Sequence, residues 1–270
     1  RDDEGNPSQF IYSRLGNPNR TALETKFAIL EKGADALAFS SGMAAAMAIC
    51  QSLLRPGDHI IIPDDCYHGV AHLIKNMYSQ WQITYSEVDM IDVANVEKAI
   101  TPHTKMVLIE TPSNPLLKIV DIEAVCKIAK SKNITVTCDN TWATPYIMQP
   151  ILMGADYVFH SSTKYFGGHS DIIGGCVIVK EKNEGAEKLR EYQTVGGAVP
   201  SPFDCWLLNR SMTTLHVRMA AQAKNAATIA EYLNTHPKIE HVFFPGLPHH
   251  PNHLVAKRQM KEIYGGMLSV

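Results

Sequence analysis

The stretch ADYVFHSSTKYFGGHSD, residues 155–171, joins an apolar run to a cluster of hydroxyl groups, glycines and one lysine. Its first half is typical of a buried β-strand, because aromatic and β-branched side chains dominate it. Burying an unpaired lysine costs free energy, so Lys164 either reaches solvent or its amine has a chemical role. Where this lysine lies relative to the predicted sheet decides between the two.

The composition is that of an ordinary globular protein. The chain has 270 residues, 45% of them hydrophobic and 19% charged, with a formal net charge of −2. It lacks the basic excess that suits nucleic acid, and no apolar run is long enough to cross a bilayer. The cysteines form no C-x-x-C pair, so we interpret them as reduced core thiols of a cytoplasmic protein. They are Cys50, Cys66, Cys126, Cys138, Cys176 and Cys205.

The two ends of the chain suggest a piece of a longer protein. Residues 1–10, RDDEGNPSQF, lack an initial methionine and show no signal peptide. Residues 264–270, YGGMLSV, stop within a strand-like run. We therefore expect further residues of the protein beyond both ends.

Predicted strands and helices alternate along the chain, and the strands are continuously apolar. This pattern predicts an α/β fold with a mostly parallel sheet and helices on both faces. Thr21 and Glu24 have the spacing of a capping box, and Gly33 is expected to end that helix. A smaller domain is predicted to begin near residue 235, with a strand over residues 240–246. The predicted strands cover residues 35–41, 59–65, 81–89, 105–111, 134–139, 155–161 and 174–180, and the predicted helices 20–33, 42–54, 67–78, 95–100, 121–133 and 206–236.

Ligands of a parallel sheet bind beyond the carboxyl ends of its strands. The residues just past each predicted strand are therefore expected to converge. They supply hydroxyl, amide, carboxylate and amine groups and an aromatic ring. They are Gly42, Met43, Tyr67, His68, Asn114, Asp139, Asn140, Thr141, Ser161, Thr163 and Lys164.

Each of these features has an ordinary interpretation when taken alone. SSGMAAAM, residues 40–47, fits a tight strand-to-helix turn and has neither a P-loop nor a dinucleotide fingerprint. A carboxylate such as Asp139 commonly caps a helix, and a ring such as that of Tyr67 commonly packs in a core. Together, an amine, a carboxylate, an aromatic face and a phosphate cradle match what pyridoxal 5′-phosphate (PLP) requires. Lys164 would form a Schiff base with the PLP aldehyde, and Asp139 would keep the pyridine nitrogen protonated.

Five segments have the character of motifs: YSRLGNP (12–18), SSGMAA (40–45), ETPSNPLLKIVDI (110–122), DNTWATP (139–145) and SSTKYFGGHSDIIGG (161–175). In order and spacing they resemble the Cys/Met-metabolism PLP enzymes, which include cystathionine γ-synthases, cystathionine γ- and β-lyases and methionine γ-lyases. The resemblance runs from Tyr12 to the end of the chain. It implies the aspartate-aminotransferase-like fold (PLP fold type I) and PLP as the cofactor.

The resemblance implies a role for each residue that matches a motif. Lys164 is similar to the lysine that binds the cofactor covalently, and Asp139 to the partner of the pyridine nitrogen. Tyr67 resembles the tyrosine that stacks on the ring and assists proton transfer. Asn114 would lie near the 3′-oxygen of the cofactor and the substrate, and Thr141 beside the cofactor. Freed by an incoming amino acid, the Lys164 amine would remove the Cα proton before the Cγ substituent leaves.

The resemblance also implies how the phosphate is held and how the subunits assemble. The backbone amides of Gly42 and Met43 and the hydroxyl groups of Ser161 and Thr163 resemble the phosphate donors. Residues 1–20 would contact the neighbouring subunit, where Tyr12 and Arg14 would reach its phosphate. A dimer or a dimer of dimers is implied, with a large PLP-binding domain over residues 21–235 and the start of a small C-terminal domain over residues 236–270.

Two departures from the family pattern bear on the substrate. Most members have glycine where this chain has His68, and methionine γ-lyases have cysteine where it has Gly69. The segments at residues 196–210 and 214–219 are closest to the γ-synthase and γ-lyase branches. The expected reaction is therefore γ-replacement, with a thiol adding at Cγ, or γ-elimination, with release of an α-keto acid. Cystathionine β-lyase and methionine γ-lyase activities rank behind it.

Readings from other classes remain open at this point. A catalytically silent binding protein could share the fold, although none of the motifs is broken. A metal site is the other alternative, because His68 and His72 are four residues apart on a predicted helix. The sequence PHHPNH, residues 248–253, is more typical of a polar loop than of a metal-binding tract.

Overall fold

The computed structural model describes residues 10–270, and its centre is a seven-stranded sheet. The strands follow the order β1-β7-β6-β5-β4-β2-β3 across the sheet. Only β7 runs antiparallel to its neighbours, so the predicted, mostly parallel α/β sheet is confirmed. The strands are β1 (Asp35–Phe39), β2 (His59–Pro63), β3 (Thr84–Val88), β4 (Thr104–Glu110), β5 (Thr135–Asp139), β6 (Tyr157–Ser161) and β7 (Gly175–Val179).

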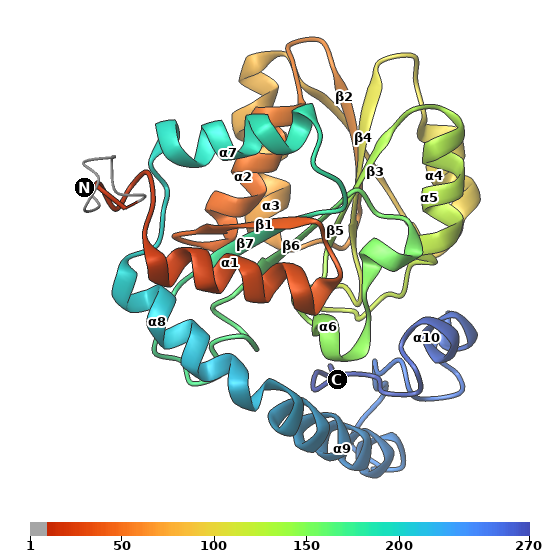
Figure 1. The fold of residues 1–270 in the computed structure, drawn as a ribbon. Coiled ribbons are helices and arrows are strands. Elements are labelled where there is room, and N and C mark those ends of the chain that lie inside the picture. Colours follow the sequence, from red (N-terminus) through yellow and green to blue (C-terminus); the bar gives the residue numbers. More distant parts are fainter. Residues whose placement is uncertain (1–9) are drawn as a thin grey trace.

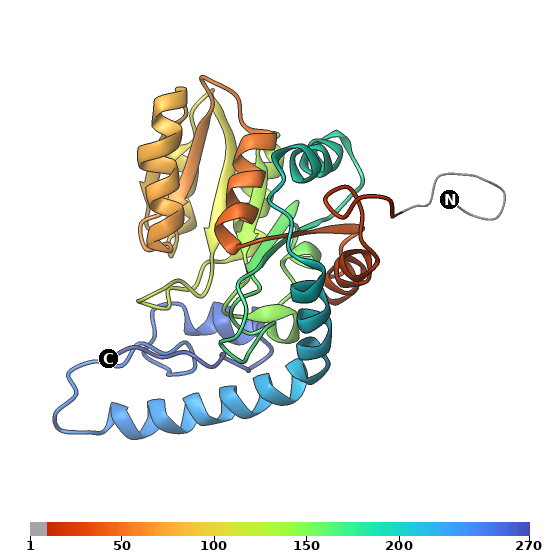
Figure 2. The same ribbon diagram turned by 90° about the vertical axis from the view of Figure 1, so that its left-hand side faces the viewer.

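Helices cover both faces of the sheet (Figures 1 and 2). One face packs against α1 (Pro18–Glu31), α4 (Val93–Ala99) and α5 (Ile122–Ser131), and the other against α2 (Gly42–Leu53) and α7 (Glu184–Gly196). Side chains alternate across each strand, so successive strand residues pack into two separate cores, one on each face of the sheet. The remaining helices are α3 (His68–His72), α6 (Thr144–Ile147), α8 (Pro202–Ser211), α9 (Leu215–Asn234) and α10 (His253–Gln259).

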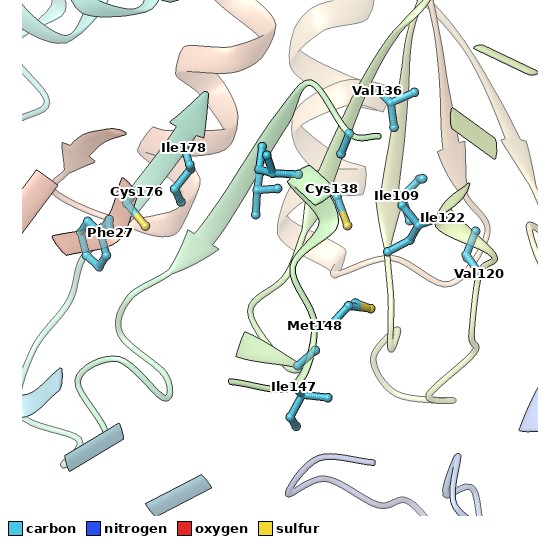
Figure 3. Packing of buried hydrophobic residues seen from close by; sticks show 14 of the residues in the cluster. Phe27, Ile109, Val120, Ile122, Val136, Cys138, Ile147, Met148, Cys176 and Ile178 are labelled. Carbon is cyan, nitrogen blue, oxygen red and sulfur yellow. The ribbon is translucent and has the colours of Figure 1, made fainter. Parts of the chain in front are cut away.

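The core on the α1 face joins strands that are distant in the sequence. Phe27 of α1 lies beside Cys176 and Ile178 of β7, as Figure 3 shows. Further along the same layer, Ile109 of β4 and Cys138 of β5 are fully buried. Each fully buried aliphatic or aromatic side chain contributes on the order of 1.5–3 kcal/mol, so this layer fixes the positions of the strand ends.

The start of α1 differs from the predicted capping box. The helix begins at Pro18, and the side chain of Asn17 caps it by accepting the amides of Asn19 and Arg20. A proline at the first helical position loses no hydrogen bond, so the Asn-Pro pair outcompetes a later start. Glu24 instead turns inward and accepts the amide of Ala38 at 2.9 Å. The capping-box prediction was therefore wrong.

The end of α1 also depends on a residue other than the predicted one. Lys32 caps the helix in the left-handed conformation, at φ 64°. Gly33 follows this cap and donates its amide to the carbonyl of Ala28 at 2.9 Å. It also serves packing, because a Cβ there would lie 2.3 Å from Cγ2 of Ile178 in β7.

The predicted helix over residues 206–236 forms as two helices, α8 and α9, whereas α7 was not predicted. A 3₁₀ turn over Met212–Thr214 separates α8 from α9. The predicted strand over residues 240–246 does not form, because backbone pairing is limited to a single bridge between Phe243 and Ser269. Side chains of this segment pack on α9 in a small apolar cluster of Ala226, Ala230, Val242, Phe244 and Leu247.

Candidate active site

A cavity of about 320 Å³ opens at the carboxyl ends of the central strands. All nine residues that were predicted to surround the cofactor within one chain line this cavity. They are Gly42, Met43, Tyr67, Asn114, Asp139, Thr141, Ser161, Thr163 and Lys164. His68 and Asn140 also follow strands but lie outside its lining, and Asn140 is buried in a bond to Glu31. A separate cavity of about 390 Å³ at the end of α2 contains none of these residues.

The N-terminus of α2 forms one wall of the cavity. Ser41 caps the helix and accepts the amide of Ala44 at 3.0 Å, whereas the amides of Gly42 and Met43 lack an intrahelical acceptor. A Cβ at Gly42 would lie 2.8 Å from Cβ of Ser161, so only glycine lets the helix end approach β6 this closely. Free amides at a helix N-terminus beside a serine hydroxyl suit an anion such as phosphate.

Asp139 ends β5 and is held as a buried acceptor. Its Oδ1 accepts the hydroxyl of Thr141 at 2.5 Å and the amide of Thr141 at 2.9 Å. Burial raises the pKa of Asp139 above its usual value, and the two bonds from Thr141 and the nearby His160 oppose this rise. A carboxylate in such a site gains from a cationic partner inside the cavity.

Lys164 lies in the turn that follows β6, and its side chain is exposed. Its backbone amide donates to the carbonyl of Ser161 at 3.2 Å, and its carbonyl accepts the amide of Gly168 at 2.7 Å. The side chain borders the cavity and also a second cavity of about 710 Å³, which Trp142 and Tyr165 share. The lysine therefore avoids the desolvation cost while its side chain lines both cavities.

The Thr163 hydroxyl is already bonded within the chain. It donates to the carbonyl of Gly174 at 3.2 Å and accepts the amide of Gly174 at 3.0 Å. These bonds fix the turn before Lys164.

Tyr67 lines the cavity, and 49% of the residue's surface is exposed. A Cβ at Gly69 would lie 2.6 Å from Cε1 of this ring and 3.0 Å from Sδ of Met43. The glycine therefore leaves room for the ring in its present position. His68, next to Tyr67, points outside the cavity lining and is exposed.

Glu110 lines the cavity and was not predicted as a site residue. It ends β4, is 2% exposed, and its Oε2 accepts the backbone amide of Tyr67 at 2.6 Å. The sequence did contain a signal for Glu110. Like Asp139, it is a carboxylate at the end of an apolar strand. Its contact with Tyr67 spans 43 residues and depends on the fold.

Tyr12 and Arg14 lie away from the cavity. Arg14 stacks its guanidinium 5.2 Å from the centre of the Tyr12 ring and donates to the carbonyl of Thr194. Tyr12 is 56% exposed. Neither residue contributes to the cavity of its own chain, and their expected contact with a neighbouring subunit stays a prediction. Residues 1–9 of the expected contact segment lie outside the described part of the chain.

Within residues 10–270, no three or more His, Cys, Asp and Glu side chains gather in a way that could hold a metal ion. The rings of His68 and His72 are 5.9 Å apart. In the same residues, every helix is too short or too polar to span a bilayer. All six cysteines are unpaired, and five of them are buried. Burial raises the pKa of the Cys50 thiol to about 12, as befits an inert core cysteine.

The residues around the cavity fit PLP. The α2 N-terminus beside Ser161 offers a cradle for its phosphate, and a Cβ at Gly42 would clash with Ser161 there. Asp139 offers a carboxylate whose burial favours a cationic partner, and Lys164 offers an amine at the same cavity. When bound, PLP supplies an aldehyde for amines and a protonated ring that accepts electrons from the substrate α-carbon.

Comparisons with known proteins agree with this geometry. Residues 1–270 match the family model described as "Cys/Met metabolism PLP-dependent enzyme". The chain is 47% identical over 261 residues to the cystathionine gamma-synthase of Mycobacterium tuberculosis, and 46% identical over 262 residues to the cystathionine beta-lyase of Coxiella burnetii. Each match covers 97% of this chain and 67% of the relative.

A solved structure shares the fold over almost the whole chain. The cystathionine gamma-lyase of Lactobacillus plantarum, solved in complex with L-serine, superposes with a TM-score of 0.95 at 43% identity. The match covers 99% of this chain and 70% of that one. The chain therefore has the fold of PLP-dependent cystathionine enzymes, and it belongs to the Cys/Met metabolism PLP-dependent enzyme family.

Proposed function

We propose that this protein catalyses γ-replacement or γ-elimination on sulfur amino acids derived from homoserine, as a cystathionine γ-synthase or γ-lyase. The observation that carries the proposal is that Lys164, Asp139 and the N-terminus of α2 meet at one cavity. The relatives named cystathionine gamma-synthase and cystathionine gamma-lyase support this choice. The match to a cystathionine beta-lyase makes β-elimination the second candidate.

Within this proposal, Lys164 is the residue that binds the cofactor covalently and then moves protons. Its exposed side chain lines both cavities, so the amine would be available to a cofactor and to the Cα proton of a substrate. Asp139 holds the ring nitrogen, and its bonds to Thr141 keep one carboxylate oxygen fixed. The amides of Gly42 and Met43 and the hydroxyl group of Ser161 hold the phosphate, and the Thr163 hydroxyl would join them by giving up its bond to the carbonyl of Gly174.

Tyr67 and Asn114 complete the cofactor site. Tyr67, which is half exposed, lines the cavity, where its ring is placed to cover a planar ligand. Asn114 lines the same cavity, where its amide is available to a cofactor or substrate oxygen. Small-molecule amino acids are the expected substrates, and the chemistry takes place in the cytoplasm.

We also propose that the site is completed by a second copy of the chain. Tyr12 and Arg14 lie on the surface, away from their own cavity, which suits a contact to a neighbouring phosphate. The assembly would be a dimer or a dimer of dimers. Residues 21–235 would form the PLP-binding domain, and residues 236–270 would begin a smaller one. The oligomeric state follows from light scattering of the full-length protein, and a monomer would contradict the shared site.

The test is a parallel assay of the full-length protein with PLP and three substrate sets. These are cystathionine alone, O-succinylhomoserine with cysteine, and methionine alone. Cystathionine formation identifies a synthase. Release of α-ketobutyrate with cysteine identifies a γ-lyase, and release of pyruvate with homocysteine identifies a β-lyase. If no substrate turns over and borohydride traps no cofactor, the protein is a silent binding protein and the proposal is wrong.

A further inference from the structure

Glu110 joins two loops at the edge of the cavity. Its Oε2 accepts the Tyr67 amide at 2.6 Å, and the backbone amide of Asn114 also donates to its carboxyl group. Its other oxygen, Oε1, is buried and has no partner among residues 10–270. One side chain thus holds the backbone next to the aromatic ring and next to the amide that are proposed to face the cofactor.

A second buried carboxyl group lies beside it. Glu110 and Asp139 are in register on the neighbouring parallel strands β4 and β5, and both line the cavity. Two buried carboxyl groups that line one cavity do not both ionise readily, because each negative charge disfavours the other. Burial first, and then the charge of Asp139, raise the pKa of Glu110 well above its usual value.

The hydrogen bonds show which of the two groups is better suited to carry the charge. Asp139 receives both a hydroxyl and an amide bond on one oxygen, and the neighbouring His160 also favours its ionised form. Glu110 accepts the Tyr67 amide on Oε2, and the Asn114 amide also lowers its pKa, but its Oε1 has no hydrogen-bond partner among residues 10–270. A bare carboxylate oxygen in a buried site is costly, whereas a proton on that oxygen removes the charge.

We propose that Glu110 is a positioning residue whose carboxyl group stays protonated, and that it fastens the Tyr67 and Asn114 loops while Asp139 alone carries the negative charge. In this arrangement Oε2 acts as a carbonyl acceptor for the Tyr67 amide, and the proton sits on Oε1. The inference rests on the proposed roles of Tyr67 and Asp139. It makes no claim about which sulfur amino acid is the substrate.

Infrared difference spectroscopy of the full-length protein tests the proton directly. Comparing wild type with Glu110→Gln at neutral pH should show the loss of a protonated carboxyl stretch. The matched control is Glu123→Gln, which removes an exposed carboxylate at the first turn of α5 and should change carboxylate bands only. Loss of carboxylate bands in Glu110→Gln would overturn the proposal. This readout needs neither turnover nor a known substrate.

The positioning role is tested by cofactor binding and amide exchange. Glutamine keeps an acceptor for both amides, so Glu110→Gln should change the dissociation constant of PLP by no more than about threefold, whereas Glu110→Ala should weaken binding roughly tenfold or more. Hydrogen exchange of a peptide containing Tyr67 should speed up in the alanine variant alone. Equal losses of PLP affinity in both variants would overturn the positioning role. If Glu110→Ala does not fold, a change of more than about threefold in the PLP dissociation constant of Glu110→Gln would overturn it.

Charged and titratable groups from several elements surround Glu110 and affect its protonation. The protonated carboxyl band in the infrared spectrum should therefore be measured across a range of pH. Asp139 faces it from β5, and Asp65 and Cys66 face it from the segment after β2. The protonated band should persist through neutral pH in wild type. A band that disappears well below neutral pH would show an ionised Glu110 and contradict the proposal.

Discussion

Oγ1 of Thr141 donates a 2.5 Å hydrogen bond to Oδ1 of Asp139. The same hydroxyl oxygen accepts the amide of Ser161 at 2.9 Å. One threonine therefore connects the carboxylate at the end of β5 to the end of β6, three residues before Lys164. The relative placement of the proposed ring partner and the proposed covalent lysine depends on this link.

Removing the Thr141 hydroxyl should weaken the cofactor site. A hydrogen bond to a charged group contributes on the order of 1.5–3 kcal/mol, so Thr141→Val should raise the dissociation constant of PLP at least about tenfold. Its loss also raises the pKa of Asp139 further and disfavours the carboxylate. Thr141→Ser keeps the hydroxyl and should stay near wild type in the same binding titration. Unchanged affinity in the valine variant would contradict the link.

Replacing Lys164 should remove the covalent attachment of the cofactor. Lys164→Ala leaves no amine at this position, which lines both cavities, so borohydride should trap no cofactor on the protein and turnover should be abolished. Mass spectrometry after reduction measures the trapped adduct. Lys105→Ala, an exposed lysine on β4, is the matched control and should be trapped like wild type. Trapping that survives in Lys164→Ala would place the covalent bond elsewhere.

A methyl group at Gly42 should disturb the end of α2. In Gly42→Ala, the new Cβ would lie 2.8 Å from Cβ of Ser161, and overpacking of this kind costs about 1–3 kcal/mol. We expect a lower free energy of unfolding in urea and weaker phosphate-dependent binding of PLP. The control is Gly196→Ala in the last turn of α7, where the nearest atom would be 3.5 Å away. That change should be neutral or stabilise by up to about 1 kcal/mol, because alanine favours the helix. A stable, tightly binding Gly42→Ala protein would show that the helix end can shift freely.

Stability should fall in acid through His250. Burial lowers the pKa of this histidine from 6.5 to about 4, while its Nε2 donates to the carbonyl of Leu117 at 3.0 Å. The unfolded chain takes up a proton at higher pH than the folded one. The stabilisation from neutral His250 is therefore complete above pH 6.5 and is lost as pH falls toward 4.

The matching variant is His250→Gln, which keeps a donor for Leu117 and removes the titration. Urea unfolding of both proteins across this pH window measures the free energy of unfolding. Between neutral pH and pH 4 this free energy should fall less in the variant, by on the order of 1–3 kcal/mol. Parallel curves would assign the acid sensitivity to other groups. The bond matters for the site because Leu117 follows Asn114 in the same loop.

The sequence allowed the sheet and most of its covering helices to be predicted from local patterns, although α7 was missed. The strand-end pattern gave eleven candidate residues, and the family resemblance gave the nine that line the cavity. Apolar strand runs such as that of β2 are buried on both faces, and a residue that follows a parallel strand has to lie at its carboxyl end. Predictions failed where two local signals competed. At α1 the Asn17-Pro18 pair outcompeted the Thr21 capping box. The prediction of a strand over residues 240–246 failed for another reason, because the segment makes only one backbone bridge.

What the sequence determined by itself is therefore the order of the seven sheet strands along the chain and the chemical groups placed at each strand end. Only the tertiary structure decided which of these groups touch. The register of β4 with β5 sets Glu110 beside Asp139, and the packing of the Tyr67 loop brings its amide to Glu110 across 43 residues. Such contacts depend on strand register and on close packing between distant segments, which local propensity and periodicity do not encode.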